Sequence, residues 1–217
     1  MLKIKVFPQN PYQMNTHLLY DESGAGVLID AGNSNEQELQ EITDFVTREQ
    51  IDLKMLLNTH AHIDHIVGNN AIIEKFGVEL YAHKAGLRFY EEAGQFSASL
   101  GFDLKQAHLP DHFIEDGDEI PFGNTTLKVL YTPGHADGSV CFYSEKDQIV
   151  VVGDVLFQQS IGRTDLPTGD FDLLAHSIRS KLYTLPPDTE VFPGHGPTTR
   201  ISYEKLDNPF VRGDSML

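Results

Sequence analysis

Three histidines and one aspartate lie close together in the segment HAHIDH at residues 60–65. Neutral imidazoles and carboxylates are the ligands that zinc and similar cations prefer. In an extended segment, side chains two residues apart point the same way, so His60 and His62 can bind one metal ion. Asp64 and His65 are adjacent and can reach away from that ion. The segment can therefore serve two metal ions, provided that other parts of the chain supply further ligands.

Three later segments supply such ligands. Each places a glycine and a metal-capable side chain directly after an apolar, strand-like run: Gly134-His135, Gly153-Asp154 and Gly194-His195. Glycine lets the backbone turn sharply and approach a crowded centre. One such pair could arise by chance, but three at strand ends, together with the first segment, predict a dinuclear metal site.

The predicted ligands divide into two groups. They are His60, His62 and His135 for the first metal, and Asp64, His65 and His195 for the second. Asp154 has two carboxylate oxygens and can bridge both metals, with a water or hydroxide completing the bridge. We predict that Asp64 and Asp154 are the catalytic carboxylates as well as ligands. The alternative is a solvated loop that binds metal adventitiously, which does not explain the apolar strand leading into residues 60–65.

Strand-like and helix-like segments alternate along the chain and must position these ligands. The expected strands are residues 3–7, 17–20, 26–30, 55–58, 78–81, 125–131, 139–143, 148–153 and 190–192. The expected helices are residues 35–50 (with Ser34 as N-cap), 67–76 and 170–182. Apolar residues at helical spacing support the helices.

Residues 15–30 and 138–154 both consist of strand, polar turn and strand, and both end near an aspartate, which indicates two related halves. Such an internal echo is typical of a duplicated plan. We therefore expect a single domain over residues 1–217. Its fold class is α/β, with two mixed sheets packed face to face and helices outside.

Composition limits the classes of partner. The 16 Lys and Arg against 32 Asp and Glu give a formal net charge of −16, which repels phosphate backbones and argues against a nucleic-acid substrate. No apolar run approaches the roughly 20 residues of a membrane helix, and the N-terminus lacks the apolar core of a signal peptide. We therefore expect a cytoplasmic protein without a membrane partner. Cys141 is the only cysteine and is expected to be buried.

Other residues have weaker assignments. Arg163 is the candidate contact for a substrate anion, with an ion pair to Asp165 as the alternative. The other candidate pocket residues are Tyr12, Tyr81 and His83. The remaining histidines, expected to be structural or exposed, are His17, His108, His112 and His176. Asp30 is expected to bind loop backbone rather than metal. Residues 84–112 are either a lid over the substrate or a helical excursion that packs on the fold.

The ligand pattern resembles the metallo-β-lactamase superfamily, and within it the glyoxalase II-like (hydroxyacylglutathione hydrolase-like) hydrolases of a short bacterial type. The residues that carry the resemblance are 59–68, His135, Asp154, His195, 160–167, 193–199 and 208–210. The resemblance implies an αββα sandwich and a dinuclear hydrolytic site. The two metal ions are expected to be zinc, with iron or manganese as alternatives.

The implied activity is thioester hydrolysis by a metal-bridging hydroxide, on a small and anionic thioester. Glyoxalase II proper carries an additional C-terminal helical region that helps to bind glutathione. This sequence extends only to Leu217, so the use of glutathione stays open. Alternatives on the same fold are a lactonase and a mononuclear-iron persulfide dioxygenase, which the run at residues 162–165 also resembles. A non-catalytic metal-binding protein is a further alternative. Asp154, in place of a cysteine, argues against a β-lactamase.

Overall fold

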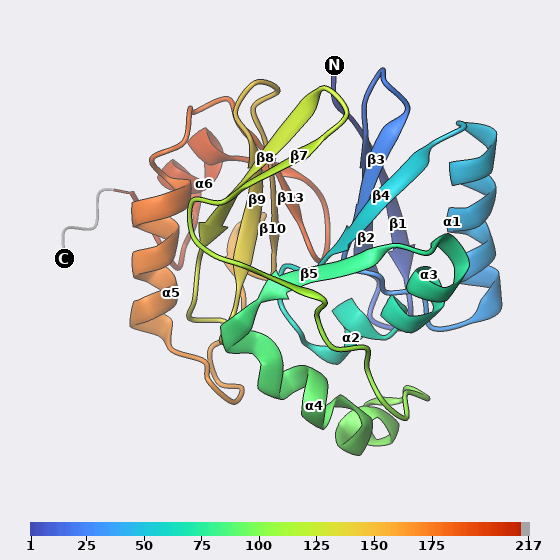
Figure 1. The fold of residues 1–217 in the computed structure, drawn as a ribbon. Coiled ribbons are helices and arrows are strands. Elements are labelled where there is room, and N and C mark those ends of the chain that lie inside the picture. The colour runs from blue at the N-terminus through green and yellow to red at the C-terminus, as the bar shows by residue number, and fades with distance from the viewer. Residues whose placement is uncertain (214–217) are drawn as a thin grey trace.

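Two six-stranded sheets face each other in the computed structural model, which describes residues 1–213, and helices cover their outer sides (Figure 1). The first sheet has the order β1 (Lys3–Gln9), β2 (Met14–Tyr20), β3 (Ala25–Ile29), β4 (Asp52–Leu57), β5 (Glu79–His83) and β6 (His112–Ile114). The second has the order β14 (Thr199–Arg200), β13 (Glu190–Pro193), β10 (Ile149–Gly153), β9 (Val140–Ser144), β8 (Thr125–Tyr131) and β7 (Glu119–Phe122). A short hairpin pairs β11 (Leu156–Phe157) with β12 (Ser160–Ile161).

The helices lie outside this pair of sheets. They are α1 (Glu36–Arg48), α2 (Ile63–Ile66), α3 (Asn69–Phe76), α4 (Leu87–Phe96), α5 (Phe171–Ser177) and α6 (Ile201–Asp207). Shorter helical turns are η1 (Lys84–Gly86), η2 (Ser97–Leu100) and η3 (Ile178–Leu182). In Figure 1, α1 and α3 flank the first sheet and α5 flanks the second. The predicted αββα sandwich is therefore confirmed.

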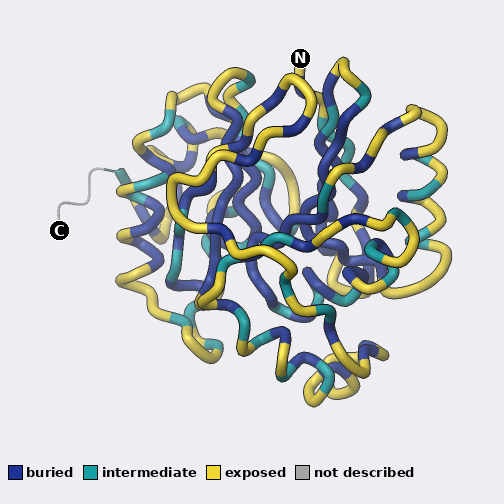
Figure 2. The backbone as a smooth tube through the Cα atoms, in the orientation of Figure 1, coloured by how far each residue is buried: buried dark blue, intermediate teal, exposed yellow. Residues whose placement is uncertain are grey.

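Alternate residues of the central strands serve different layers of the core, because successive side chains of a strand point to opposite faces. Val27 and Ile29 belong to the apolar layer between the two sheets, whereas Leu28 packs under the helices of the first sheet. Val151 lies between the sheets, and its neighbours Val150 and Val152 face the helices of the second. Figure 2 shows the resulting buried centre under an exposed outer shell.

The two halves share one pairing pattern. Strands β1, β2 and β3 pair antiparallel and β3 pairs parallel with β4. Strands β8, β9 and β10 pair in the same antiparallel way, and β10 pairs parallel with β13. This repeat of topology fits the predicted relation between residues 15–30 and 138–154. It also gives β4 in the first half and β13 in the second half equivalent positions in their sheets.

Two predicted helix starts differ from the structure. The N-cap of α1 is Asn35 rather than Ser34: its side chain accepts a hydrogen bond from the Glu38 backbone N–H. Ser34 instead donates its hydroxyl to the Glu38 carboxylate. The helix predicted over 67–76 begins two residues later, at Asn69, as α3, and a separate short helix, α2, precedes it at Ile63–Ile66. Within residues 1–213, no helix is long and apolar enough to cross a membrane.

Candidate metal centre

All seven predicted ligands follow the ends of four strands. The segment at residues 60–65 comes after β4, His135 after β8, Asp154 after β10 and His195 after β13. The backbone is extended at His62 and helical from Ile63, so Asp64 and His65 are carried on α2 toward the second donor group. The His65 ring still packs on the His60 ring, with centroids 4.1 Å apart. One segment therefore faces two places, as the sequence predicted.

The first group of donors consists of three imidazole nitrogens. His62 Nδ1 lies 3.2 Å from His60 Nε2 and 3.0 Å from His135 Nε2. Three nitrogens at these separations can bind one cation. His62 thus presents Nδ1 to the group, whereas the other two histidines present Nε2.

The second group contains one carboxylate and two imidazoles. His195 Nε2 is 3.1 Å from Asp64 Oδ2, and His65 Nε2 is 3.7 Å from the same oxygen. Asp64 and His65 come from α2, which follows β4 of the first sheet, whereas His195 comes from the loop after β13 of the second sheet. The second group can therefore hold a second cation across the two halves.

Asp154 lies between the two groups. Its Oδ2 atom is 3.7 Å from His135 Nε2 of the first group and 3.7 Å from His195 Nε2 of the second. Its Oδ1 atom is 3.4 Å from His65 Nε2. One carboxylate therefore faces donors of both groups, which is the arrangement that bridging two cations requires.

Two buried atoms support a fit to metal. Among the described residues, His65 Nε2 and Asp154 Oδ1 are buried without a hydrogen-bond partner. Leaving such groups unpaired costs about 1–3 kcal/mol each, more for a charged group. A cation would satisfy both, and the mixture of imidazole and carboxylate donors suits zinc, iron or manganese. The residues present therefore fit a divalent metal site.

Charge and burial shift the titration of these groups in opposite directions. Burial lowers the pKa of His60 well below its ordinary value and that of His62 to about 4, which keeps both imidazoles neutral as metal binding requires. Burial also acts on His65, but the carboxylates of Asp154, Asp64 and Asp30 outweigh it and raise the pKa of His65. This excess of negative charge around His65 is what a cation would neutralise.

The nitrogens that face away from the centre are held by partners that the sequence did not reveal. His135 Nδ1 donates to the Arg163 carbonyl at 2.7 Å, and His195 Nδ1 donates to the Tyr12 carbonyl at 3.1 Å. His65 Nδ1 lies 2.9 Å from Asp30 Oδ2. Such partners fix the tautomer and orientation of a ligating imidazole.

Asp30 supports the centre from behind. Its carboxylate accepts hydrogen bonds from the Thr59 backbone and hydroxyl and from the Asn58 amide, in addition to His65. Asp30 also lies near His60 and His65 in a spacing that could hold an ion. Four donors already occupy its oxygens, and one of them is the Thr59 backbone N–H, the kind of loop contact that was predicted. That Asp30 does not bind a metal stays a prediction.

Close packing explains the glycines at the centre. A Cβ on Gly194 would collide with Asp154 Oδ1 and would lie 2.7 Å from His65 Cε1. Gly153 has a positive φ of 51°, and a Cβ at this position would collide with the Thr59 side chain. Gly162 was missed in the sequence: a Cβ there would collide with the Asp154 carbonyl and lie 2.9 Å from His135 Nδ1. In the sequence, the only indication of a role for Gly162 was its place in the run at residues 160–167.

The predicted substrate residues have other contacts here. The Arg163 guanidinium makes two 2.9 Å hydrogen bonds to Asp165, the alternative considered for it. The Tyr12 side chain is half exposed and its hydroxyl donates to the Leu100 carbonyl. His83 stacks on Tyr131 with ring centroids 4.3 Å apart. Only Tyr12 and Arg163 touch the centre, through their backbone carbonyls.

The other histidines lie outside both donor groups. His108 pairs with Asp111 and His112 pairs with Glu79, both at the exposed edge of the first sheet. His176 is exposed on α5, and His17 is buried on β2. Burial lowers the pKa of His17 to about 4, so it is neutral at physiological pH. These positions agree with their predicted structural or exposed character.

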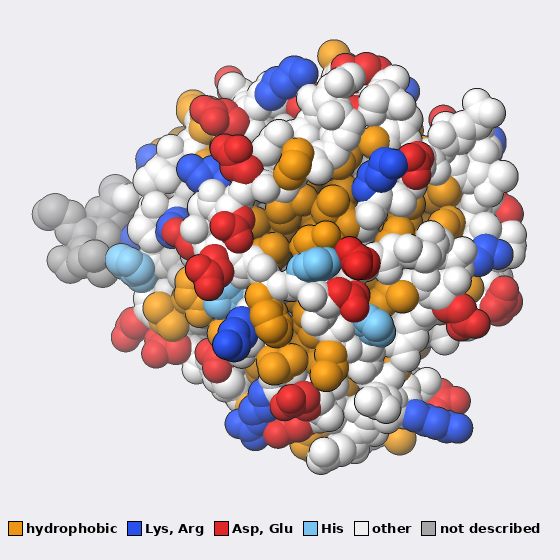
Figure 3. Space-filling model, in the orientation of Figure 1, with side chains coloured by type: hydrophobic (Ala, Val, Ile, Leu, Met, Phe, Trp, Pro, Cys, Tyr) orange, Lys and Arg blue, Asp and Glu red, His pale blue; other side chains and the backbone are white. Residues whose placement is uncertain are grey.

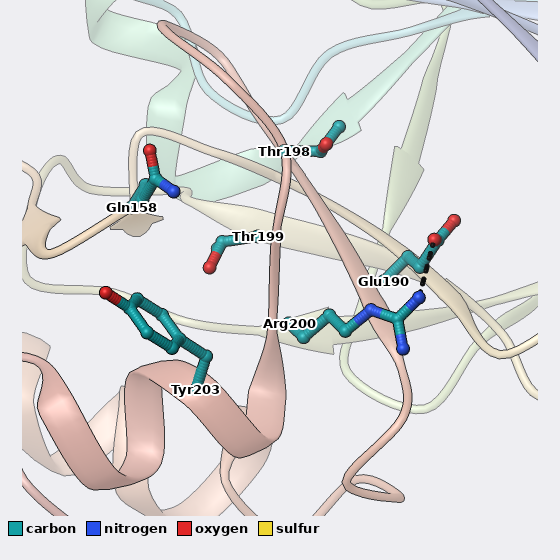
Figure 4. A pocket seen from close by; sticks show the side chains of 6 residues that line it. All are labelled: Gln158, Glu190, Thr198, Thr199, Arg200 and Tyr203. Carbon is teal, nitrogen blue, oxygen red and sulfur yellow. Dashed lines mark hydrogen bonds and ion pairs between the residues drawn. The ribbon is translucent and has the colours of Figure 1, made fainter.

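The molecular surface adds little to the definition of the centre. A pocket of about 280 Å³ lies beside β14 (Figure 4), and none of the seven predicted ligands lines it. Its lining residues are Gln158, Glu190, Thr198, Thr199, Arg200 and Tyr203. Arg200 Nη2 there faces Glu190 Oε1 at 3.4 Å. Acidic side chains are spread over the face shown in Figure 3, in keeping with the net charge of −16.

Comparison with known proteins assigns the family. A family model described as the metallo-beta-lactamase superfamily matches residues 10–195. The chain therefore belongs to this superfamily, whose hydrolases depend on metal. Its fold, together with the clustered histidines and aspartates, indicates a divalent metal site.

Similarity to individual members extends over nearly the whole chain. The hydroxyacylglutathione hydrolase GloC of Haemophilus influenzae is 34% identical, covering 99% of this chain and 100% of that protein. A structure titled BLEG-1 B3 metallo-beta-lactamase is 37% identical with a TM-score of 0.88, covering 97% of this chain and 99% of that one. The structure of TTHA1623 in a di-iron-bound form is 35% identical with a TM-score of 0.85, covering 95% of this chain and 100% of that one.

Proposed function

We propose that this protein is a dinuclear metal hydrolase that cleaves thioesters, of the hydroxyacylglutathione hydrolase type. The position of Asp154 carries the dinuclear part of the proposal. Its Oδ2 atom is equally far, at 3.7 Å, from a nitrogen of each donor group. The similarity to the hydrolase GloC supports the thioester part.

The chain's own side chains would divide the work between two ions. His60, His62 and His135 would hold the first, and Asp64, His65 and His195 the second. Asp154 would hold both at once. Divalent ions supply a water of lowered pKa and polarise a carbonyl oxygen, which is the chemistry that hydrolysis needs.

Imidazoles and carboxylates in these numbers suit zinc, and they also suit iron or manganese. The di-iron-bound relative supports a pair of ions without deciding which element this chain binds. The protein itself contributes fixed donor positions, because at least five of the seven ligand residues are no more than 17% exposed to solvent. A small anionic substrate would be attracted to the ions in spite of the acidic surface.

A thioester needs little help from a general acid, because a thiolate is a good leaving group. This fits a centre where titratable groups are occupied as ligands or held by partners. The proposal therefore requires no separate proton donor among the described residues.

The test combines metal analysis with a panel of substrates. We expect about two metal ions per chain and turnover of thioesters, with S-lactoylglutathione and thioesters of other thiols assayed side by side. Inactivity on every thioester with turnover of lactones would overturn the thioester assignment but keep the dinuclear centre. One iron per chain with oxygen consumption on a persulfide would overturn both and favour a dioxygenase.

A further inference from the structure

The segment α4–η2 touches the metal centre from outside the ligand motifs. The Phe89 ring meets the His62 ring edge-on, with centroids 5.5 Å apart. Next to it on α4, the Tyr90 side chain is 1% exposed and its hydroxyl enters the polar network behind the centre. Residues 84–112, predicted as either a lid or a packed excursion, thus contact the ligand His62 through the partly buried Phe89 and reach the polar network behind the centre through the buried Tyr90.

Tyr90 fixes the orientation of the Asn58 amide. The Tyr90 hydroxyl donates to Asn58 Oδ1 at 2.9 Å, and Asn69 Nδ2 donates to the same oxygen at 2.7 Å. Two donors on this oxygen require the amide nitrogen to point the other way. That nitrogen faces Asp30 Oδ1 at 3.4 Å and the His65 carbonyl at 3.3 Å.

The network ends on a ligand of the second group. Asp30 Oδ2 accepts from His65 Nδ1 at 2.9 Å, and His65 Nε2 on the opposite side of the ring faces Asp64 and Asp154. The amide of Asn58 therefore contacts both the partner and the backbone of His65. A flipped amide would place its oxygen against the Asp30 carboxylate, which is repulsive in a buried setting.

We propose that Tyr90 is a positioning residue for the second metal ion, acting through Asn58 and Asp30 on His65; this rests on the proposed dinuclear centre. Removal of its hydroxyl leaves one donor on Asn58 Oδ1 and weakens the constraint on the His65 ring. The first ion is affected less. Its links to the network run through His60, whose ring packs on the His65 ring with centroids 4.1 Å apart and whose Nδ1 faces the Thr59 hydroxyl. No metal-binding nitrogen of the first group accepts from or donates to Asn58, and Thr59 keeps its own bonds to Asp30.

The test is stepwise zinc binding by the full-length Tyr90→Phe variant, measured by competition with a coloured chelator. Loss of an outer partner typically weakens metal binding by about 10–100-fold, and Tyr90 acts through intermediates, so we expect the second step to weaken by about 10-fold. The first step should stay within about 2-fold of the unaltered protein.

Tyr183→Phe is the matched control. The Tyr183 hydroxyl is also buried and also makes hydrogen bonds, to the carbonyls of Glu204 and Val211, away from the centre. Both variants should melt at a lower temperature in metal-free form, by calorimetry. Only Tyr90→Phe should lose second-site affinity.

The outcomes separate the two proposals. Equal weakening of both zinc steps in Tyr90→Phe, or no change in either, would overturn the role of Tyr90 and leave the dinuclear centre standing. Equal second-step losses in both variants would show general destabilisation and would also overturn it. A single zinc per unaltered chain would overturn the dinuclear centre and with it this inference.

Discussion

Asp154 differs from the other six candidate ligands because its oxygens face donors of both groups. Replacement by asparagine keeps the size of the side chain but removes its charge and one oxygen. We expect Asp154→Asn to bind about one metal ion instead of two and to lose more than about 100-fold in kcat, since the chemistry depends on both ions. Metal analysis and thioester turnover measure the two effects. Asp188→Asn, at an exposed loop position, is the control and should change neither.

Gly194 makes a second prediction at the scale of single residues. A methyl group there would collide with Asp154 and His65, so Gly194→Ala should weaken metal binding by at least about 10-fold. Gly196 offers a close comparison, because it has a positive φ of 75° but open space around its Cα. Gly196→Ala should therefore cost about 1 kcal/mol of stability through backbone strain alone. If calorimetry and metal titration gave both variants the same loss of metal, steric crowding at Gly194 would not be the cause.

At the scale of elements, the ligand positions were predictable because each ligand segment follows a strand whose apolar residues can be recognised in the sequence. Apolar runs of β4, β10 and β13 stand directly before their ligands in the sequence, and the predicted bounds of these strands differ from the observed ones by a few residues. Their layers follow from the alternation of side chains.

The elements that escaped prediction lack such signals. Strands β11, β12 and β14 contain two residues each, and β6 and β7, which also escaped prediction, contain three and four, so that little or no periodicity can show. Partners such as the Tyr12 and Arg163 carbonyls come from distant parts of the chain, and a backbone carbonyl carries no mark in the sequence. Gly162 was invisible for the same reason: its crowding arises only when the β11–β12 hairpin packs on His135.

The start of α1 gives an element-scale prediction. The Asn35 side chain accepts a hydrogen bond from the Glu38 backbone N–H, and truncation to alanine removes this acceptor. Asn35→Ala should therefore lower the free energy of unfolding by about 1 kcal/mol. Ser34→Ala removes only an exposed hydrogen bond to a side chain and should cost less. Urea denaturation of the two variants measures both values. A larger loss in Ser34→Ala would restore Ser34 as the N-cap.

At the scale of the whole molecule, the two halves are joined by polar contacts at the turns as well as by the apolar layer between the sheets. Asp21, in the turn between β2 and β3, accepts hydrogen bonds from the backbone of Asn124 and the hydroxyl of Thr125 in the second sheet. It also accepts two from Ser23 in its own turn. Asp21 is 4% exposed, so these bonds are largely shielded from water.

This contact should make the union of the halves depend on pH. Burial raises the pKa of Asp21, but the hydrogen bonds from Ser23, Asn124 and Thr125 outweigh it and lower the pKa from 3.8 to about 2. Because the folded pKa is the lower one, the carboxylate stabilises the fold above about pH 4, and this stabilisation is lost as the pH falls through about 2. Because water near the molecular surface screens part of this interaction, the shift corresponds to no more than about 1–2 kcal/mol.

Asp21→Asn should therefore unfold about 1–2 kcal/mol more easily than the unaltered chain at pH 7, because a neutral amide accepts these four hydrogen bonds less strongly. Urea denaturation at a series of pH values measures the difference, which should be constant from pH 7 to about 4 and then shrink. Asp188→Asn, on an exposed loop, should give no such difference at any pH. A deficit in Asp21→Asn that stayed unchanged down to pH 2 would mean that packing, and not the charge of this carboxylate, joins the two halves at their turns.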